Sequence, residues 1–151
     1  MKIYLASDHA GFHLKSRIHA YLVQHDYDVE DVGDETFDPK DDYPQFAYAA
    51  TTKLLGTKED ARAILICGSG QGMCIAANRV HGIRATVVES VWMAKDVRED
   101  DDSNILCLPA RVLEKQDSKL VTDILDTWLK TPFSNAPRHT RRLKEIEELY
   151  G

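Results

Sequence analysis

The most reactive residue types in the chain cluster in a glycine-rich segment. The segment reads Cys67-Gly68-Ser69-Gly70-Gln71-Gly72. An apolar run over 63–66 precedes it and helix-forming residues follow over 73–80, so we expect it to join a buried strand to a helix. Glycines at a helix N-terminus expose backbone N–H groups that can bind a phosphate or an enediolate. A helix N-terminus also lowers the pKa of a thiol, which makes Cys67 a candidate base.

Two other interpretations of this segment stay open on the residues alone. Cys67 can be a small buried hydrophobe, with the glycines only making a tight turn. The glycine spacing also imitates a dinucleotide fingerprint followed by an acidic residue, Glu89. We disfavour a nicotinamide-dependent enzyme, because Gly72 and Met73 stand where the fingerprint has a variable residue and its third glycine.

Residues that could bind a phosphorylated ligand occur at two further places. The segment Ser7-Asp8-His9-Ala10-Gly11 follows the first apolar run, so His9 could bind a phosphate or a hydroxyl, although a loop histidine is often merely solvated. Near the C-terminus, Arg138 and Arg142 are four residues apart and share one helical face, which suits a phosphate. Glutamates at 145, 147 and 148 leave open the alternative of an ordinary salt-bridged helix.

The elements that would position these residues alternate along the chain. Apolar runs over 3–6, 27–32, 63–66, 83–88 and 105–108 predict strands. Stretches over 12–22, 44–55, 73–80, 91–98 and 112–130 predict helices, and 34–42 forms an acidic loop. Strands that are apolar throughout and alternate with helices indicate a parallel sheet. We predict a Rossmann-like α/β fold with about five parallel strands, helices on both faces, and a ligand site beyond the carboxyl ends of the strands.

Length and composition indicate a single domain over 1–151. The 151 residues are 43% hydrophobic, enough for one core, which we place at 1–130. Residues 131–151 form a C-terminal extension whose helix has no strand to cover, so we expect it to pack on a partner subunit. The net charge of −6 offers no positive field for nucleic acid or an anionic membrane. The N-terminal apolar run is too short for a signal peptide or a membrane span, so we expect a cytoplasmic protein.

The cysteines give no sign of a structural cross-link. Cys67, Cys74 and Cys107 are odd in number and lack the close pairing or histidine partners of a zinc site. We therefore predict neither a disulfide nor a metal site.

Several segments together resemble the ribose-5-phosphate isomerase B family, which also includes the galactose-6-phosphate isomerase subunits. These segments are SDHAGFHLK, DDYP, CGSGQGMCIAANR, GIRA, SNILCLPAR and RHTRR, and they span nearly the whole chain. The resemblance implies an aldose–ketose isomerase acting on a sugar phosphate, with ribose 5-phosphate as the first candidate. It also implies that no metal or nucleotide cofactor is used. A homodimer or dimer of dimers, with each site shared between two subunits, is the expected assembly.

The resemblance further implies a role for each matching residue. Cys67 would be the base, because Met73 stands where another branch of the family has its glutamate base. Ser69 would move protons between the substrate oxygens, and the backbone N–H groups of the glycine segment would hold the enediolate. The residues expected to bind phosphate are His9, Arg111, Arg138 and Arg142, and those expected to line the sugar are Asp8, Tyr43 and Asn78.

One segment departs from the family pattern. Where the family typically reads R-x-H-N-D-x-N, residues 98–104 read R-E-D-D-D-S-N, so Asp100 and Asp101 replace a histidine and an asparagine. In relatives that histidine is assigned to opening the sugar ring. An aspartate has an ordinary pKa of about 3.9 and is mostly ionised at neutral pH, although burial or a neighbouring carboxylate raises that pKa. We expect Asp100 to take the catalytic position and Asp101 to contact substrate.

The same departure keeps two alternative functions open. A tetrose 4-phosphate cannot close a five-membered ring, because its terminal oxygen is phosphorylated. An enzyme that acts on this substrate would not need the histidine for ring opening. A phosphosugar-binding protein that has lost catalysis would also tolerate the change. Ribose 5-phosphate remains the preferred substrate.

Overall fold

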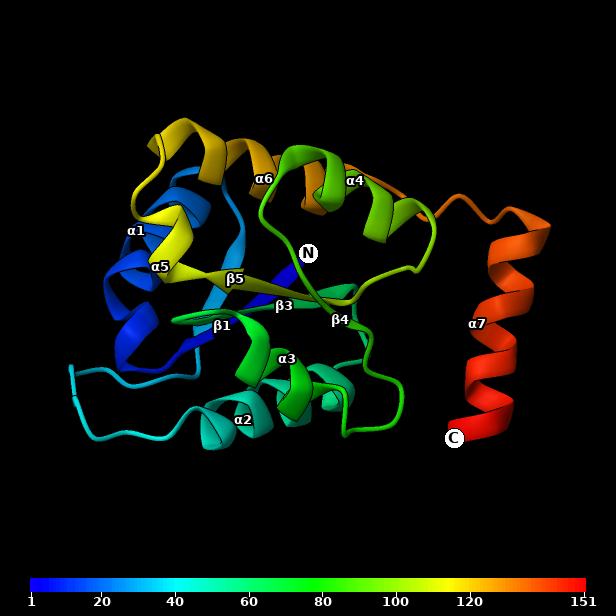
Figure 1. The fold of residues 1–151 in the computed structure, drawn as a ribbon, viewed down its shortest axis with the longest axis horizontal. Coiled ribbons are helices and arrows are strands. Elements are labelled where there is room, and N and C mark those ends of the chain that lie inside the picture. Colours follow the sequence, from blue (N-terminus) through cyan, green and yellow to red (C-terminus); the bar gives the residue numbers. More distant parts are fainter.

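A computed structural model describes residues 1–151 as one parallel sheet covered by helices (Figure 1). The strands are β1 (Lys2–Ser7), β2 (Asp28–Asp31), β3 (Ala61–Cys67), β4 (Ala85–Val87) and β5 (Ile105–Pro109). Their order in the sheet is β2-β1-β3-β5-β4, and every neighbouring pair is parallel. The predicted Rossmann-like sheet of five parallel strands is therefore confirmed.

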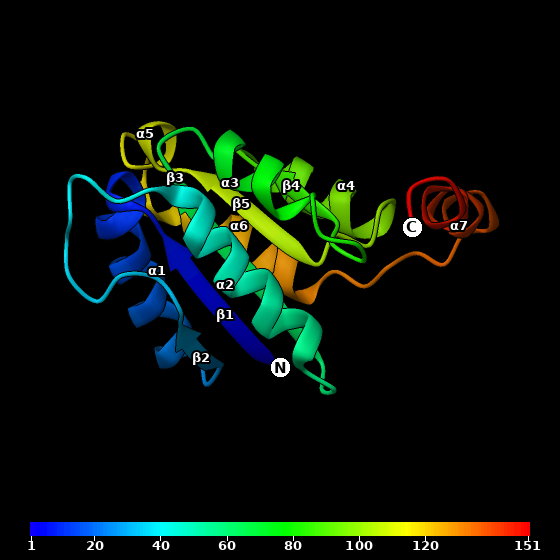
Figure 2. The ribbon, with the colours of Figure 1, turned by 90° about the horizontal axis from the view of Figure 1, so that it is seen from below.

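Helices cover both faces of the sheet, as predicted. One face carries α1 (Phe12–Gln24), α4 (Val91–Glu99), α5 (Ala110–Leu113) and α6 (Ser118–Lys130). The other face carries α2 (Tyr43–Gly56) and α3 (Gln71–Ala77) (Figure 2). Alternate residues of β3 enter the two cores: Ile64 and Ile66 face one, and Leu65 and Cys67 face the other. Each fully buried large aliphatic side chain stabilises the fold by about 1.5–3 kcal/mol. The buried side chains of β3 therefore hold the end of this strand at a defined place in the sheet.

The structure corrects the single helix predicted over 112–130. That stretch contains the end of α5 at Leu113, a turn, and α6, which starts at Ser118. The Asp117 side chain accepts a hydrogen bond of 2.9 Å from the backbone N–H of Lys119 and so caps the new helix. A side chain that satisfies free N–H groups favours a helix start over helix continuation, and the apolar spacing on both sides concealed that start.

Two smaller boundaries also differ from the prediction. β4 pairs only over 85–87, shorter than the predicted 83–88, and α3 covers 71–77 instead of 73–80. The segment after β1 contains one turn of 3-10 helix, η1 (His9–Gly11), which the sequence analysis treated as a loop.

The C-terminal helix α7 (Pro137–Tyr150) stands at the edge of the molecule beside α4 (Figures 1 and 2). Its first turn is held by His139, whose side chain is buried. Further along, Leu149 and Tyr150 are 67% and 80% exposed, so much of its apolar surface has no partner within the chain. Packing of α7 on a second subunit stays a prediction. None of the helices in the structure combines the length and apolar character that a membrane span requires.

Candidate active site

A cavity of about 190 Å3 opens at the carboxyl ends of β1 and β3, where an open parallel sheet binds its ligands. The residues that line it are Asp8, His9, Ala10, Tyr43, Cys67, Gly68, Ser69, Gly72 and Arg111. All of them except Ala10 are predicted site residues. The fold therefore brings together side chains that lie up to about a hundred positions apart.

Cys67 is the last residue of β3 and is 4% exposed. The apolar residues before it are buried on both faces of the sheet, which fixes Cys67 at the carboxyl edge. Ser69, two residues later, is exposed at the rim, and its Oγ accepts a hydrogen bond of 3.3 Å from the backbone N–H of Gln71. The Ser69 hydroxyl hydrogen remains available to a substrate oxygen.

The glycines allow two side chains to approach the segment closely. A Cβ atom at Gly68 would lie 2.8 Å from Cζ of Arg111, whose backbone N–H also donates to the Gly68 carbonyl at 3.0 Å. A Cβ atom at Gly72 would lie 2.8 Å from Cζ of Tyr43. Gly70 has a φ of 73°, the left-handed conformation that turns the chain into α3. The glycines thus shape the cavity wall as well as the turn.

Asp8 is buried at the start of η1. Its Oδ1 accepts a hydrogen bond of 3.1 Å from the backbone N–H of Gly11, which caps the turn. Burial raises the pKa of the Asp8 carboxyl, with the Gly11 bond opposing it. Asp8 therefore keeps its proton to a higher pH than an exposed aspartate.

His9 is held by a residue that the sequence analysis did not select. Its Nδ1 lies 2.6 Å from Oδ1 of Asp41, and its backbone N–H donates to the same oxygen at 3.0 Å. The Asp41 contact is the main cause that raises the pKa of His9. A more persistent positive charge suits a phosphate ligand. The only signal for Asp41 was the acidic loop that precedes Tyr43.

Gly70 and Gln71 stand at the start of α3 between two lining residues but do not line the cavity themselves, and the other predicted residues lie elsewhere in the chain. Asn78 donates to the carbonyl of Ala85 at 2.9 Å and accepts from its N–H at 2.8 Å, so its amide is used within the fold. Asp100 and Asp101 follow α4 and precede β5, at the amino edge of the sheet. Figure 1 shows α7, which carries Arg138, at that same end and far from the carboxyl ends of the strands. Arg142 lies one turn further along α7.

These amino-edge residues form a cluster around His139, a residue that the sequence analysis did not select. Arg138 Nε donates to His139 Nε2 at 2.7 Å, so the other ring nitrogen carries the hydrogen. That nitrogen, Nδ1, lies 2.8 Å from Ser134 Oγ and 3.3 Å from Asp100 Oδ1. Burial and the nearby Asp100 raise the pKa of Asp101. A single chain therefore holds two separate groups of predicted site residues.

Asp102, the third aspartate of the segment that differs from the family pattern, has a structural role. Its two carboxylate oxygens bind Arg84 at 2.8 Å and Arg98 at 2.9 Å, and its φ is 47°. These contacts tie the turn after α4 to the body of the protein.

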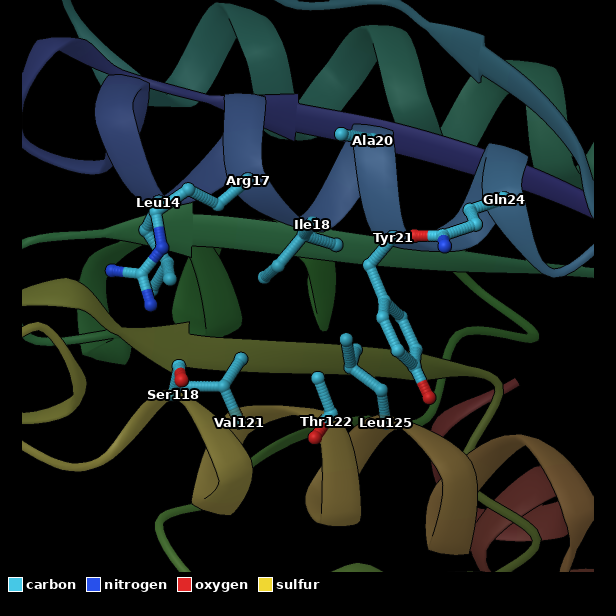
Figure 3. Close-up of a pocket in the computed structure, with 10 residues that line it drawn as sticks. All are labelled: Leu14, Arg17, Ile18, Ala20, Tyr21, Gln24, Ser118, Val121, Thr122 and Leu125. Atoms are coloured by element: carbon cyan, nitrogen blue, oxygen red, sulfur yellow. The ribbon is translucent and has the colours of Figure 1, made fainter.

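A larger cavity, about 320 Å3, lies between α1 and α6 (Figure 3). Its walls are mainly apolar, with Leu14, Ile18 and Val121 among them. Tyr21 donates to Asp126 at 2.8 Å, and burial raises the pKa of Tyr21 to about 12. This cavity offers no base for proton transfer.

No group of three His, Cys, Asp or Glu side chains converges as a metal site requires.

Comparisons with known proteins show the family of the chain. The family model described as Ribose/Galactose Isomerase matches residues 3–146. The probable ribose-5-phosphate isomerase B of Mycoplasma genitalium is 40% identical, covering 95% of this chain and 92% of that protein. The ribose-5-phosphate isomerase B of Mycolicibacterium paratuberculosis is 38% identical, covering 98% and 91%.

Solved structures resemble the fold over nearly its whole length. Ribose-5-phosphate isomerase B of Clostridium thermocellum gives a TM-score of 0.91 at 42% identity, covering 99% of this chain and 97% of that one. The Mycoplasma genitalium enzyme with bound ribulose 5-phosphate gives a TM-score of 0.90 at 38% identity, covering 97% and 94%.

Proposed function

The chain belongs to the ribose/galactose isomerase family of aldose–ketose isomerases, and from this premise we propose that it converts ribose 5-phosphate to ribulose 5-phosphate with Cys67 as its base. The observation that carries the proposal is the position of Cys67 in the wall of a cavity that also holds two cationic side chains, His9 and Arg111. A base beside a phosphate-binding pair is what proton transfer on a sugar phosphate needs.

The proposed reaction moves one proton between neighbouring carbons. The Cys67 thiolate removes the hydrogen on C2 of the open-chain aldose, and the electron pair forms the C1–C2 double bond of an enediolate. Backbone N–H groups of residues 68–72 donate to the enediolate oxygens, where negative charge develops. Cys67 then returns the proton to C1, while the Ser69 hydroxyl transfers the proton from O2 to O1. The product is the ketose, and the thiolate is regenerated.

The phosphate would be bound from two sides. His9 and Arg111 lie on the cavity, whereas Arg138 and Arg142 lie at the opposite edge of the sheet and cannot reach it within one chain. A second copy of the chain that supplies α7 would complete the site, so we propose a homodimer with shared sites. The exposed apolar residues of α7 support such an assembly.

Ring opening would fall to Asp100 and Asp101, supplied by the second copy with α7. Because burial and the Asp100 charge raise the pKa of Asp101, Asp101 retains its proton to a higher pH than an isolated aspartate. A proton held by the Asp101 carboxyl would be available to the ring oxygen of the sugar. A cytoplasmic location stays an expectation from the sequence.

The replacement of the family histidine at position 100 favours one competing substrate, a tetrose 4-phosphate. The deciding experiment measures isomerisation of ribose 5-phosphate, allose 6-phosphate and erythrulose 4-phosphate by the purified protein, with solvent deuterium incorporation at C2. Turnover of ribose 5-phosphate is the expected result. Turnover of erythrulose 4-phosphate alone would show that the tetrose phosphate, and not ribose 5-phosphate, is the substrate. Neither turnover nor exchange with any of the three sugars would refute catalysis and favour a phosphosugar-binding protein.

A further inference from the structure

We infer that Asp41 is a positioning residue for His9, which it holds in one orientation with a positive charge facing the cavity. The inference rests on the proposed function, because it takes the phosphate of the substrate as the ligand of His9. Asp41 acts through His9 and is not among the residues that line the cavity.

The geometry of the contact restrains both the ring and the backbone of His9. A single oxygen, Asp41 Oδ1, lies 2.6 Å from the ring Nδ1 and 3.0 Å from the backbone nitrogen. Nδ1 must therefore carry a hydrogen, and Nε2 is the ring nitrogen left for a ligand. Phe37, from the same acidic loop, packs edge-on against the ring with 6.5 Å between centroids and an angle of 87°. The loop over 34–42 thus contacts the imidazole twice.

The burial of Asp41 sets it apart from its neighbours in that loop. Its side chain is 3% exposed, and Oδ2 is buried without a hydrogen-bond partner. Burying an ionised carboxylate is costly unless an opposite charge compensates it. His9 is the basic group that this carboxylate contacts, so the arrangement favours the imidazolium form of His9.

Other charges around the pair do not change this conclusion. His9 faces two carboxylates, Asp8 and Asp41, which favour its charged form, and Arg111, which opposes it. The net effect raises the pKa of His9, with the Asp41 hydrogen bond as the largest cause. On its other side Asp41 faces Asp34, whose pKa is raised by burial and by Asp41.

Charges beyond Asp34 complete the surroundings of the pair. Asp38 raises the pKa of Asp34 further, and Lys15 lowers it. Lys15 Nζ is itself held by Asp31 at 2.7 Å and by the carbonyl of Asp34 at 2.7 Å.

The test compares D41N with D38N. D41N keeps the size of the side chain and an acceptor oxygen but removes the charge beside His9. Asp38 lies in the same loop, is exposed, and accepts only from the backbone N–H of Lys40, so D38N makes the same charge change without touching His9. Two quantities are measured for each protein: the pKa of His9 by NMR titration, and KM and kcat for ribose 5-phosphate across pH.

In D41N the pKa of His9 is expected to fall. Between the lowered and the wild-type pKa, where only the wild-type imidazole is charged, KM is expected to rise about tenfold, the effect of losing one charge-assisted hydrogen bond. The KM difference closes at low pH, where His9 is protonated in both proteins, and kcat changes little. D38N is expected to behave like the wild type, and D41E to recover part of the wild-type His9 pKa and KM. A merely structural role for Asp41 would not shift the KM difference with pH.

An unchanged His9 pKa in D41N, or an equal effect of D38N, would overturn the inference. If D41N does not fold, the wild-type titration still decides, because a His9 pKa at the ordinary value of about 6.5 refutes the coupling. The titration needs no turnover, so it also separates the two ideas. If the protein proves inactive but His9 has a raised pKa that depends on Asp41, the proposed function fails while the role of Asp41 as the partner of His9 stands. Inorganic phosphate is then the ligand added to probe His9.

Discussion

The close approach of Arg111 to Gly68 gives a quantitative test of the active-site geometry. In G68A the new Cβ would lie 2.8 Å from Cζ and 2.9 Å from Nε of Arg111, closer than such atoms can remain. The φ of Gly68 is not positive, so alanine adds no backbone strain there. Because the Arg111 guanidinium is the exposed end of a flexible side chain, it can move away, and the fold should lose less than about 1 kcal/mol.

Phosphate binding should suffer much more than stability. A hydrogen bond between charged groups contributes about 1.5–3 kcal/mol, and about 1.4 kcal/mol corresponds to tenfold. We therefore expect KM for ribose 5-phosphate to rise about 10- to 150-fold in G68A. kcat should change little, since the backbone N–H of residue 68 is retained. Steady-state kinetics and thermal unfolding measure the two effects separately.

A matched variant controls for the change from glycine to alanine. A Cβ at Gly56, at the end of α2, would meet no atom within 4 Å, so G56A should leave KM unchanged. An unaltered KM in G68A would show that the position of Arg111 against this glycine does not matter for binding. A large loss of stability in G68A would show that the guanidinium cannot move, contrary to the reasoning above.

Three further predictions concern the proposed catalysis and assembly. Cys67→Ala should abolish solvent exchange at C2 while a phosphate-bearing ligand still binds in calorimetry; wild-type exchange would remove the thiol from the mechanism. Mixing Cys67→Ala with Arg142→Ala chains in equal amounts should restore about a quarter of wild-type activity if sites are shared in a twofold dimer, whereas sites within one chain give no recovery. Asp8→Asn should raise the unfolding temperature at pH 7, because burial raises the pKa of Asp8 and disfavours its ionised form. That gain should shrink as the pH falls below the folded pKa of Asp8 and disappear below the unfolded pKa of about 3.9, where the carboxyl is protonated in both states. The same gain at all pH values would contradict the assignment.

The fold was predictable because parallel strands buried on both faces leave continuous apolar runs in the sequence. β3 and β5 are such runs; the end of β3 predicted the position of Cys67, whereas Arg111 was a candidate only through the family resemblance, and both line the cavity. The turn between α5 and α6 was not predicted, because the capping interaction of Asp117 competes with apolar spacing that continues on both sides. Local signals of this kind are weak beside periodicity.

The contact of Asp41 with His9 could not be predicted from the sequence, for a different reason. Its role depends on a contact with His9, 32 positions earlier in the chain, and an acidic residue in a polar loop carries no local sign of burial. His139 is similar, since only the packing of α7 against the end of α4 reveals that its imidazole is enclosed.

The sequence by itself determined the chemical types available: a thiol after a strand, a glycine segment able to admit a ligand, and arginines and histidines able to bind phosphate. The tertiary structure decided which of them meet. In a parallel sheet all carboxyl ends lie at one edge, so Cys67, His9 and Arg111 share a cavity. The residues that precede β5 and those of α7 lie at the other edge, and for that reason Asp100 and Arg138 are apart from Cys67 within a single chain.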